Sequence, residues 1–168
     1  YMWFAGKGES CIYRYDGTRI TAFKHEEANP NSLAFGYPET IYADKKGMIW
    51  IGGNGLDQYN PATGIFKHYR HAENDSGSMA GYVAVILMDH RGRIWAGTDN
   101  GLNLLDEKTG KFLHYRNIPG DPKSLGNNIV RAIYEDHHGV LWVGTGHPWG
   151  PDEGGLNRLN PDGTFTRY

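Results

Sequence analysis

The sequence lacks several features that would assign it to a common structural or functional class. It has a single cysteine, Cys11, which excludes an internal disulfide, and no apolar run is long enough to span a bilayer. Neither charge dominates, because 17 basic and 19 acidic side chains leave a formal net charge of -2. Nucleic acid is therefore not an expected partner. No long segment keeps a helical period, so we expect an all-β protein without direct membrane contact.

Motifs that mark common enzyme classes are also missing. There is no Gly-x-Ser-x-Gly elbow and no phosphate-binding Gly-x-x-x-x-Gly-Lys sequence. Eight histidines are present. The side chains of the adjacent pair His137 and His138 do not point in the same direction, and no cysteines or histidines at metal-ligand spacing accompany this pair. His68 and His114 occupy equivalent repeat positions and are interpreted as repeat features. We expect no catalytic residue, no cofactor and no metal site.

Glycine, tyrosine and an internal repeat are what the sequence has instead. It contains 24 glycines and 11 tyrosines, together with similar segments centred on Trp3, Trp50, Trp95 and Trp142, at steps of 47, 45 and 47 residues. Short strand patterns repeated at this period are typical of β-propeller blades. We expect each of these tryptophans to pack between neighbouring blades.

Each complete unit is interpreted as four strands, of which the inner one is rich in apolar residues. The expected inner strands cover residues 37–44, 82–89 and 128–136, and each ends in an Asp-x-x-Gly turn. The first unit opens on its tryptophan strand and lacks an inner strand. The units span approximately residues 1–25, 37–70, 82–116 and 128–168. The prediction is a single β-propeller fragment with four four-stranded blades, the first without its inner strand.

Residues 133–136, 139–145 and 154–160, followed by Phe165, resemble the two-component regulator propeller repeat, and so do the connectors 29–33 and 121–128. This repeat builds the periplasmic sensors of hybrid two-component systems, best known in Bacteroidetes that respond to glycans. The resemblance implies a periplasmic, non-catalytic sensor module that binds an oligosaccharide or another small ligand. Because such sensors have more blades, the expected partners are the remaining blades of a larger propeller or a second protomer.

The candidate ligand-binding residues lie in loops on one face, where connectors between blades meet the turns between second and third strands. In each unit we count the residues from the repeated tryptophan to the first aliphatic residue of the third strand. This spacing is 14 residues from Trp142 to Leu156, against 9, 6 and 7 residues in the first, second and third units. This long loop contains His147, Trp149, Asp152 and Glu153. An aromatic face with nearby carboxylates suits a sugar ring, while packing of Trp149 under its own loop or in a protomer contact stays equally open. The other candidates on this face are Asn54, Tyr82, Asp99, Asn100 and Arg131.

Two alternative functions remain open at this point. Streptogramin lyase resembles this repeat family and opens a cyclic depsipeptide by metal-assisted elimination, so a metal near His147, Asp152 or Glu153 would favour an enzyme. The other alternative is a purely structural assembly module. The connectors 24–36, 70–81 and 116–127 share a Pro, Asn, Ser and Leu pattern, which favours a repeated structural cap over ligand contact.

Overall fold

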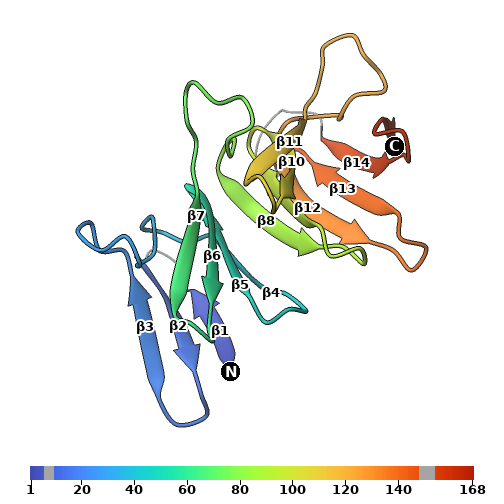
Figure 1. Cartoon of the computed structure of the whole chain (residues 1–168). Coiled ribbons are helices and arrows are strands. Elements are labelled where there is room, and N and C mark those ends of the chain that lie inside the picture. Colours follow the sequence, from blue (N-terminus) through green and yellow to red (C-terminus); the bar gives the residue numbers. More distant parts are fainter. Residues whose placement is uncertain (6–9, 148–153) are drawn as a thin grey trace.

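The computed structural model describes residues 1–5, 10–147 and 154–168. Its regular structure consists of β-strands in four antiparallel sheets, which follow one another in chain order with the N-terminal sheet and the C-terminal sheet at opposite ends (Figure 1). The prediction of an all-β protein made of propeller blades is confirmed. In the part of the chain that is described, no helix has the length and apolar character needed to cross a membrane.

Each sheet is an antiparallel meander, which we call a blade. Blade 1 has three strands, namely β1 (Met2–Ala5), β2 (Cys11–Tyr15) and β3 (Ile20–Lys24). Blade 2 consists of β4 (Thr40–Ala43), β5 (Ile49–Gly53), β6 (Gly55–Asn60) and β7 (Ile65–Tyr69). Blade 3 consists of β8 (Val83–Met88), β9 (Ile94–Thr98), β10 (Gly101–Asp106) and β11 (Lys111–Tyr115). Blade 4 consists of β12 (Val130–Glu135), β13 (Leu141–Thr145), β14 (Gly155–Leu159) and β15 (Phe165–Arg167).

The inner strands β4, β8 and β12 are shorter than the sequence predicted. At their C-terminal ends the aspartate belongs to the turn, where its backbone N–H bonds to the carbonyl four residues on, as from Asp89 to Arg93 at 3.0 Å. At the start of the expected strand 37–44, Tyr37 has a φ of 59°, which is incompatible with a strand. The missing residues therefore belong to turns and connectors.

The Asp-x-x-Gly turns form as predicted, and they also hold the tryptophans. In each turn one carboxylate oxygen accepts two backbone N–H groups of the turn, while the other accepts the indole N–H of the tryptophan on the next strand. The indole-to-carboxylate pairs are Asp44–Trp50 at 2.8 Å, Asp89–Trp95 at 2.9 Å and Asp136–Trp142 at 2.8 Å. The aspartate thus satisfies the single polar atom of a side chain that is otherwise apolar.

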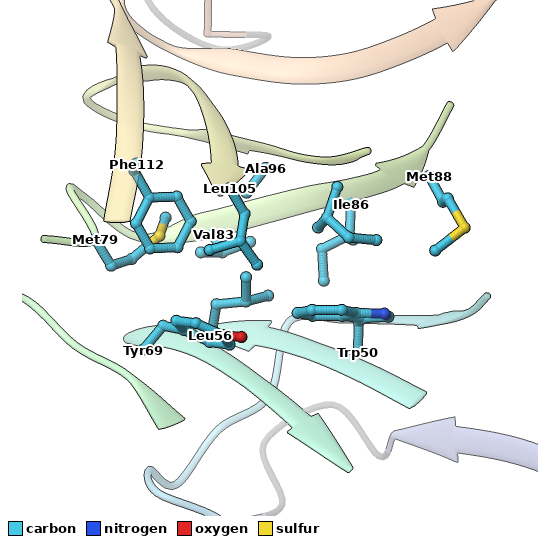
Figure 2. Close-up of a cluster of buried hydrophobic side chains, with 11 residues drawn as sticks. Trp50, Leu56, Tyr69, Met79, Val83, Ile86, Met88, Ala96, Leu105 and Phe112 are labelled. Atoms are coloured by element: carbon cyan, nitrogen blue, oxygen red, sulfur yellow. The ribbon is translucent and has the colours of Figure 1, made fainter. Parts of the chain in front are cut away.

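The hydrophobic core lies between blades rather than inside them. Trp50, Leu56 and Tyr69 of blade 2 face a cluster of apolar side chains on blade 3 (Figure 2). Trp50 and Trp95 are completely buried, whereas Trp3 and Trp142, in the two end blades, are half-buried. We call the side of a blade that contacts the following blade its trailing face, and the opposite side its leading face.

The connectors between blades are structural caps, which confirms that interpretation of their shared pattern. In each, a serine hydroxyl hydrogen-bonds the backbone six residues earlier, and the next residue enters the core between blades. These pairs are Ser32–Leu33, Ser78–Met79 and Ser124–Leu125, and the three apolar members are at most 1% exposed. His68 and His114 fix the caps from the closing strands, because their Nε2 atoms lie 2.9 and 3.0 Å from the carbonyls of Pro30 and Ser76.

Candidate functional site at the loop face

The turns between second and third strands lie at the same end of the molecule as the connectors that enter the inner strands. On blade 3, the Tyr82 N–H donates to a carboxylate oxygen of Asp99 at 2.7 Å, and the Asp99 N–H donates to the Tyr82 carbonyl at 3.3 Å. On blade 4, the Gly146 N–H donates to the Ile129 carbonyl at 2.8 Å. We call this end the loop face. It comprises residues 37–39, 54, 82, 99–100, 129–131 and 146–147.

Polar groups from two blades meet around Tyr82 on this face, and the charge of a residue on a third blade acts on it. The Tyr82 hydroxyl donates to the Tyr37 carbonyl at 3.3 Å and lies 3.5 Å from a carboxylate oxygen of Glu39, both on blade 2. Burial raises the pKa of Tyr82, the charge and hydrogen bond of Glu39 raise it further, and the positive charge of Arg131 on blade 4 opposes them. The phenol therefore stays a hydrogen-bond donor at neutral pH, next to the Glu39 carboxylate.

The strand register explains why these charges lie on neighbouring blades. Thr40, Val85 and Ala132 pair with Gly52, Gly97 and Gly144, which are equivalent positions of the repeat. The residue before each of them is Glu39, Ala84 or Arg131. At this one repeat position, blade 2 thus has an acidic residue, blade 3 a small residue and blade 4 a basic residue. In the part of the chain that is described, the Arg131 side chain makes no ion pair and is exposed, so it is open to a ligand.

Tyr37, whose carbonyl accepts the Tyr82 hydrogen bond, also exposes an aromatic ring on this face. Its side chain is 63% exposed, although the residue has a φ of 59°. Such a backbone conformation is costly for a bulky residue and recurs where function demands a particular side-chain placement. An exposed ring on the same face as an acidic and a basic residue can stack on a flat apolar surface of a ligand.

The remaining predicted residues have different positions. The side chains of Asn54 and Asn100 are exposed on the loop face, and their carbonyls accept hydrogen bonds from the guanidinium groups of Arg70 and Arg116 at 2.7 and 3.3 Å. His147 is half-buried just after β13. The predicted residues Trp149, Asp152 and Glu153 lie outside the described residues.

Sequence reasoning missed Tyr37 and Glu39. One signal for Tyr37 was available, because Gly36-Tyr37 and Gly81-Tyr82 occur at the same position of two successive units. The positive φ of Tyr37 and the approach of Glu39 to Tyr82 depend on the placement of blade 2 against blade 3. The sequence of one unit does not contain that information.

Other parts of the described chain offer fewer unpartnered polar groups for binding a ligand. Across residues 1–5, 10–147 and 154–168, no group of three or more His, Cys, Asp or Glu side chains is placed to hold a metal ion. A pocket of about 690 Å³ lies between blades 3 and 4 near the Asp-x-x-Gly turns and is lined by basic residues that include Arg93 and Arg158. Arg93 is already bound to Asp89 at 2.6 Å and Arg158 to Asn160 at 3.2 Å, so these cations are less available than Arg131.

A sequence profile of the two-component regulator propeller matches residues 77–100 and 124–147. Each match covers the end of a connector, an inner strand, an Asp-x-x-Gly turn and a tryptophan strand. This chain contains two-component regulator propeller repeats. Each matched segment contains one bond between aspartate and tryptophan, Asp89–Trp95 or Asp136–Trp142, whereas the Asp44–Trp50 bond lies outside both matches.

Three solved structures have folds similar to this chain of propeller repeats. One is assigned to the extracellular domain of the hybrid two component system BT3049 from B. thetaiotaomicron, with a TM-score of 0.72 and 20% identity over 95% of this chain and 22% of that chain. Another is a catalytically inactive virginiamycin B lyase from Staphylococcus aureus with quinupristin, with a TM-score of 0.64 and 18% identity over 99% of this chain and 50% of that chain. PorZ, a surface component of the type-IX secretion system of Porphyromonas gingivalis, has a TM-score of 0.61 and 16% identity over 95% of this chain and 24% of that chain.

These likenesses establish the fold of the propeller repeats. The chain spans half or less of each of the three proteins. No curated protein sequence matches it.

Proposed function

We propose that this chain is part of the ligand-sensing propeller of a hybrid two-component receptor and that it works outside the cytoplasm, in the periplasm. The two-component regulator propeller repeats and the likeness to an extracellular receptor domain support this proposal. The observation that carries it is the contact of the Tyr82 hydroxyl with the Tyr37 carbonyl and the Glu39 carboxylate, across two blades, on a face that also presents Arg131 of the next blade.

The ligand class that fits this cluster is an oligosaccharide. The exposed Tyr37 ring offers a surface on which a sugar can stack its C–H face, while Glu39, Tyr82 and Arg131 offer an acceptor and donors for hydroxyl groups. A ligand that touches three blades stabilises the arrangement of those blades that it binds best. This differential binding is how a sensor without catalytic groups transmits a signal. The likeness to virginiamycin B lyase, at 18% identity, is one of fold and carries no enzymatic proposal.

A glycan screen followed by calorimetry on the full chain tests this function. Tyr37→Ala and Arg131→Ala should each weaken binding of the selected glycan by about tenfold or more, because each removes a central contact. Ile65→Ala is the control, since Ile65 is 57% exposed against 63% for Tyr37 and lies at the start of the outer strand β7, away from the loop face. The proposal fails if no glycan binds, or if Tyr37→Ala and Arg131→Ala bind as well as the control.

A further inference from the structure

At the end of the molecule opposite the loop face, the Asp-x-x-Gly turn of one blade meets the turn between the third and fourth strands of the next blade. At the junction of blades 2 and 3, the Lys46 ammonium lies 3.0 Å from a carboxylate oxygen of Glu107. Met48, just before β5, packs against the apolar cluster of the same junction. An ion pair and an apolar side chain therefore occupy this junction.

The turn of blade 3 has two arginines at the equivalent positions. Arg91 and Arg93 lie two and four residues after the aspartate of their turn, as Lys46 and Met48 do in blade 2. Arg93 donates through its Nε–H to Asp89 at 2.6 Å, and its two Nη groups make no hydrogen bond within the described residues. A second cation thus stands where blade 2 has an apolar side chain.

Blade 4 has no acid at the position of Glu107. Leu105 and Leu159 pair with the same phenylalanine position of their fourth strands, and the residues two places after them are Glu107 and Pro161. In the part of the chain that is described, Arg91 makes no ion pair. Relative to the junction of blades 2 and 3, this junction has gained a base and lost an acid.

The carboxylate of Asp162, next to Pro161, does not replace the missing acid. It accepts the backbone N–H and the hydroxyl of Thr164 within its own turn, at 3.0 and 2.6 Å. It forms no ion pair with any described residue. The guanidinium of Arg91 is therefore left exposed and without a carboxylate partner.

Both arginines line the pocket of about 690 Å³ between the trailing face of blade 3 and the leading face of blade 4. Its wall also includes the half-buried side chains of Tyr115, Val140 and Leu159. Burial raises the pKa of Tyr115, so its hydroxyl is a hydrogen-bond donor at neutral pH. A space of this volume is typical of small-ligand pockets and larger than an inorganic anion needs.

We propose that this pocket binds a small organic anion, whose carboxylate or phosphate group pairs with Arg91 as the Glu107 carboxylate pairs with Lys46 at the preceding junction. Guanidinium groups bind such oxyanions through paired, charge-assisted hydrogen bonds. The Nη groups of Arg93 and the Tyr115 hydroxyl supply further donors, while the apolar part of the wall contacts the body of the ligand. The bound anion links blades 3 and 4 at the end away from the loop face.

An NMR titration of the ¹⁵N-labelled full chain at constant ionic strength tests this proposal with three probes. Benzoate and phenyl phosphate carry the two anionic groups on an aromatic ring, and benzamide has the ring without the charge. Both anions should shift the amide signals of residues 91–93 and 162–163, and benzamide should not. Arg91→Gln should weaken anion binding by about tenfold or more, because a charge-assisted contact is lost. Lys45→Gln is the matched control, since Lys45 is an exposed base in the equivalent turn of blade 2, and this variant should bind normally.

Two substitutions of Pro161 test whether the anion takes the place of the missing acid. Pro161→Glu supplies a carboxylate to Arg91 and should abolish anion binding, whereas Pro161→Gln supplies no charge and should bind as the unmodified chain does. A response to only one of the two anions supports the site and assigns the group that it takes. The proposal is overturned if neither anion shifts these signals, if benzamide shifts them equally, or if Arg91→Gln or Pro161→Glu binds as tightly as the unmodified chain.

Discussion

The carboxylate of Asp89 accepts more hydrogen bonds than its turn requires. One oxygen accepts the backbone N–H groups of Arg91 and Arg93 at 3.0 and 2.9 Å, and the other accepts the Trp95 indole at 2.9 Å and the Arg93 Nε–H at 2.6 Å. Burial opposes ionisation, but these hydrogen bonds outweigh it, so the pKa of Asp89 lies below its ordinary value of 3.8. The folded state therefore favours the ionised form.

This lowered pKa predicts an acid-sensitive contribution to stability. Because the pKa is lower in the folded than in the unfolded chain, the stabilisation is complete above the ordinary value of 3.8 and is lost as the pH falls through the folded value. Asp89→Asn should be less stable than the unmodified chain at neutral pH and should lose less free energy of unfolding on acidification. Urea denaturation at a series of pH values measures both effects.

Trp95→Phe is the companion variant for this prediction. It keeps an aromatic ring between the blades and removes only one of the donors to Asp89, so the acid dependence should shrink partially. An unchanged pH dependence in Asp89→Asn would mean that this carboxylate does not contribute to acid sensitivity.

The tryptophan strands of the inner blades depend on glycine for their contact with the next inner strand. An added Cβ at Gly97 would lie 2.5 Å from Val130 and 2.6 Å from Val85, too close for carbon atoms in a packed core. We expect Gly97→Ala to lower the free energy of unfolding by about 1–3 kcal/mol, as overpacking does. Gly144→Ala is the matched control, and we expect a loss of less than about 1 kcal/mol because only Ala132 must yield.

Chemical denaturation of both variants tests this prediction. Equal destabilisation of Gly97→Ala and Gly144→Ala would contradict it, because the difference arises from contacts between blades 3 and 4.

The elements themselves were largely predictable from the sequence, for identifiable reasons. The Asp-x-x-Gly turns and tryptophan strands are local, since each aspartate lies only six residues before the tryptophan that it binds. The strand ends were less accurate, because connector residues such as Tyr37 have a backbone conformation fixed by neighbouring blades. The caps could be recognised as repeats, but the closure of Ser124 onto Ile118 and the contact of Arg167 with Ser124 could not.

The whole molecule is a row of blades in which each interior blade is covered on both faces. Blades 2 and 3 have a neighbour on each side, whereas blades 1 and 4 have one neighbour among the described residues. The exposed apolar side chains of blade 1, and its half-buried Trp3, reflect this difference. Stability in such arrays is approximately a sum of contributions from units and their neighbours.

Hydrogen exchange at low protein concentration should therefore be graded along the row. Amides of β9 and β10 in blade 3 should exchange most slowly, since both faces of these strands are covered, and amides of β1 to β3 should exchange fastest. Mass spectrometry of peptides from a timed exchange measures this order. Protection of blade 1 equal to that of blade 3 would show that the row unfolds as one cooperative unit.

The loop face was predictable in outline only. The repeat indicated which loops lie on one face, and Tyr82 and Arg131 were among the residues named from it. Glu39 joins them only because blades 2 and 3 stand side by side, which places its carboxylate 3.5 Å from the Tyr82 hydroxyl. Groups that are distant in sequence are brought onto one face through the packing of the blades.

The bond between aspartate and tryptophan is made inside one unit and never crosses to the next. A stretch of coding DNA that specifies such a unit can therefore be duplicated in tandem, and each new copy encodes both residues of this hydrogen bond. Duplication or loss of a unit therefore leaves this bond intact in the other units. Mutations in the loops of the loop face do not remove it either, because both of its residues lie outside those loops.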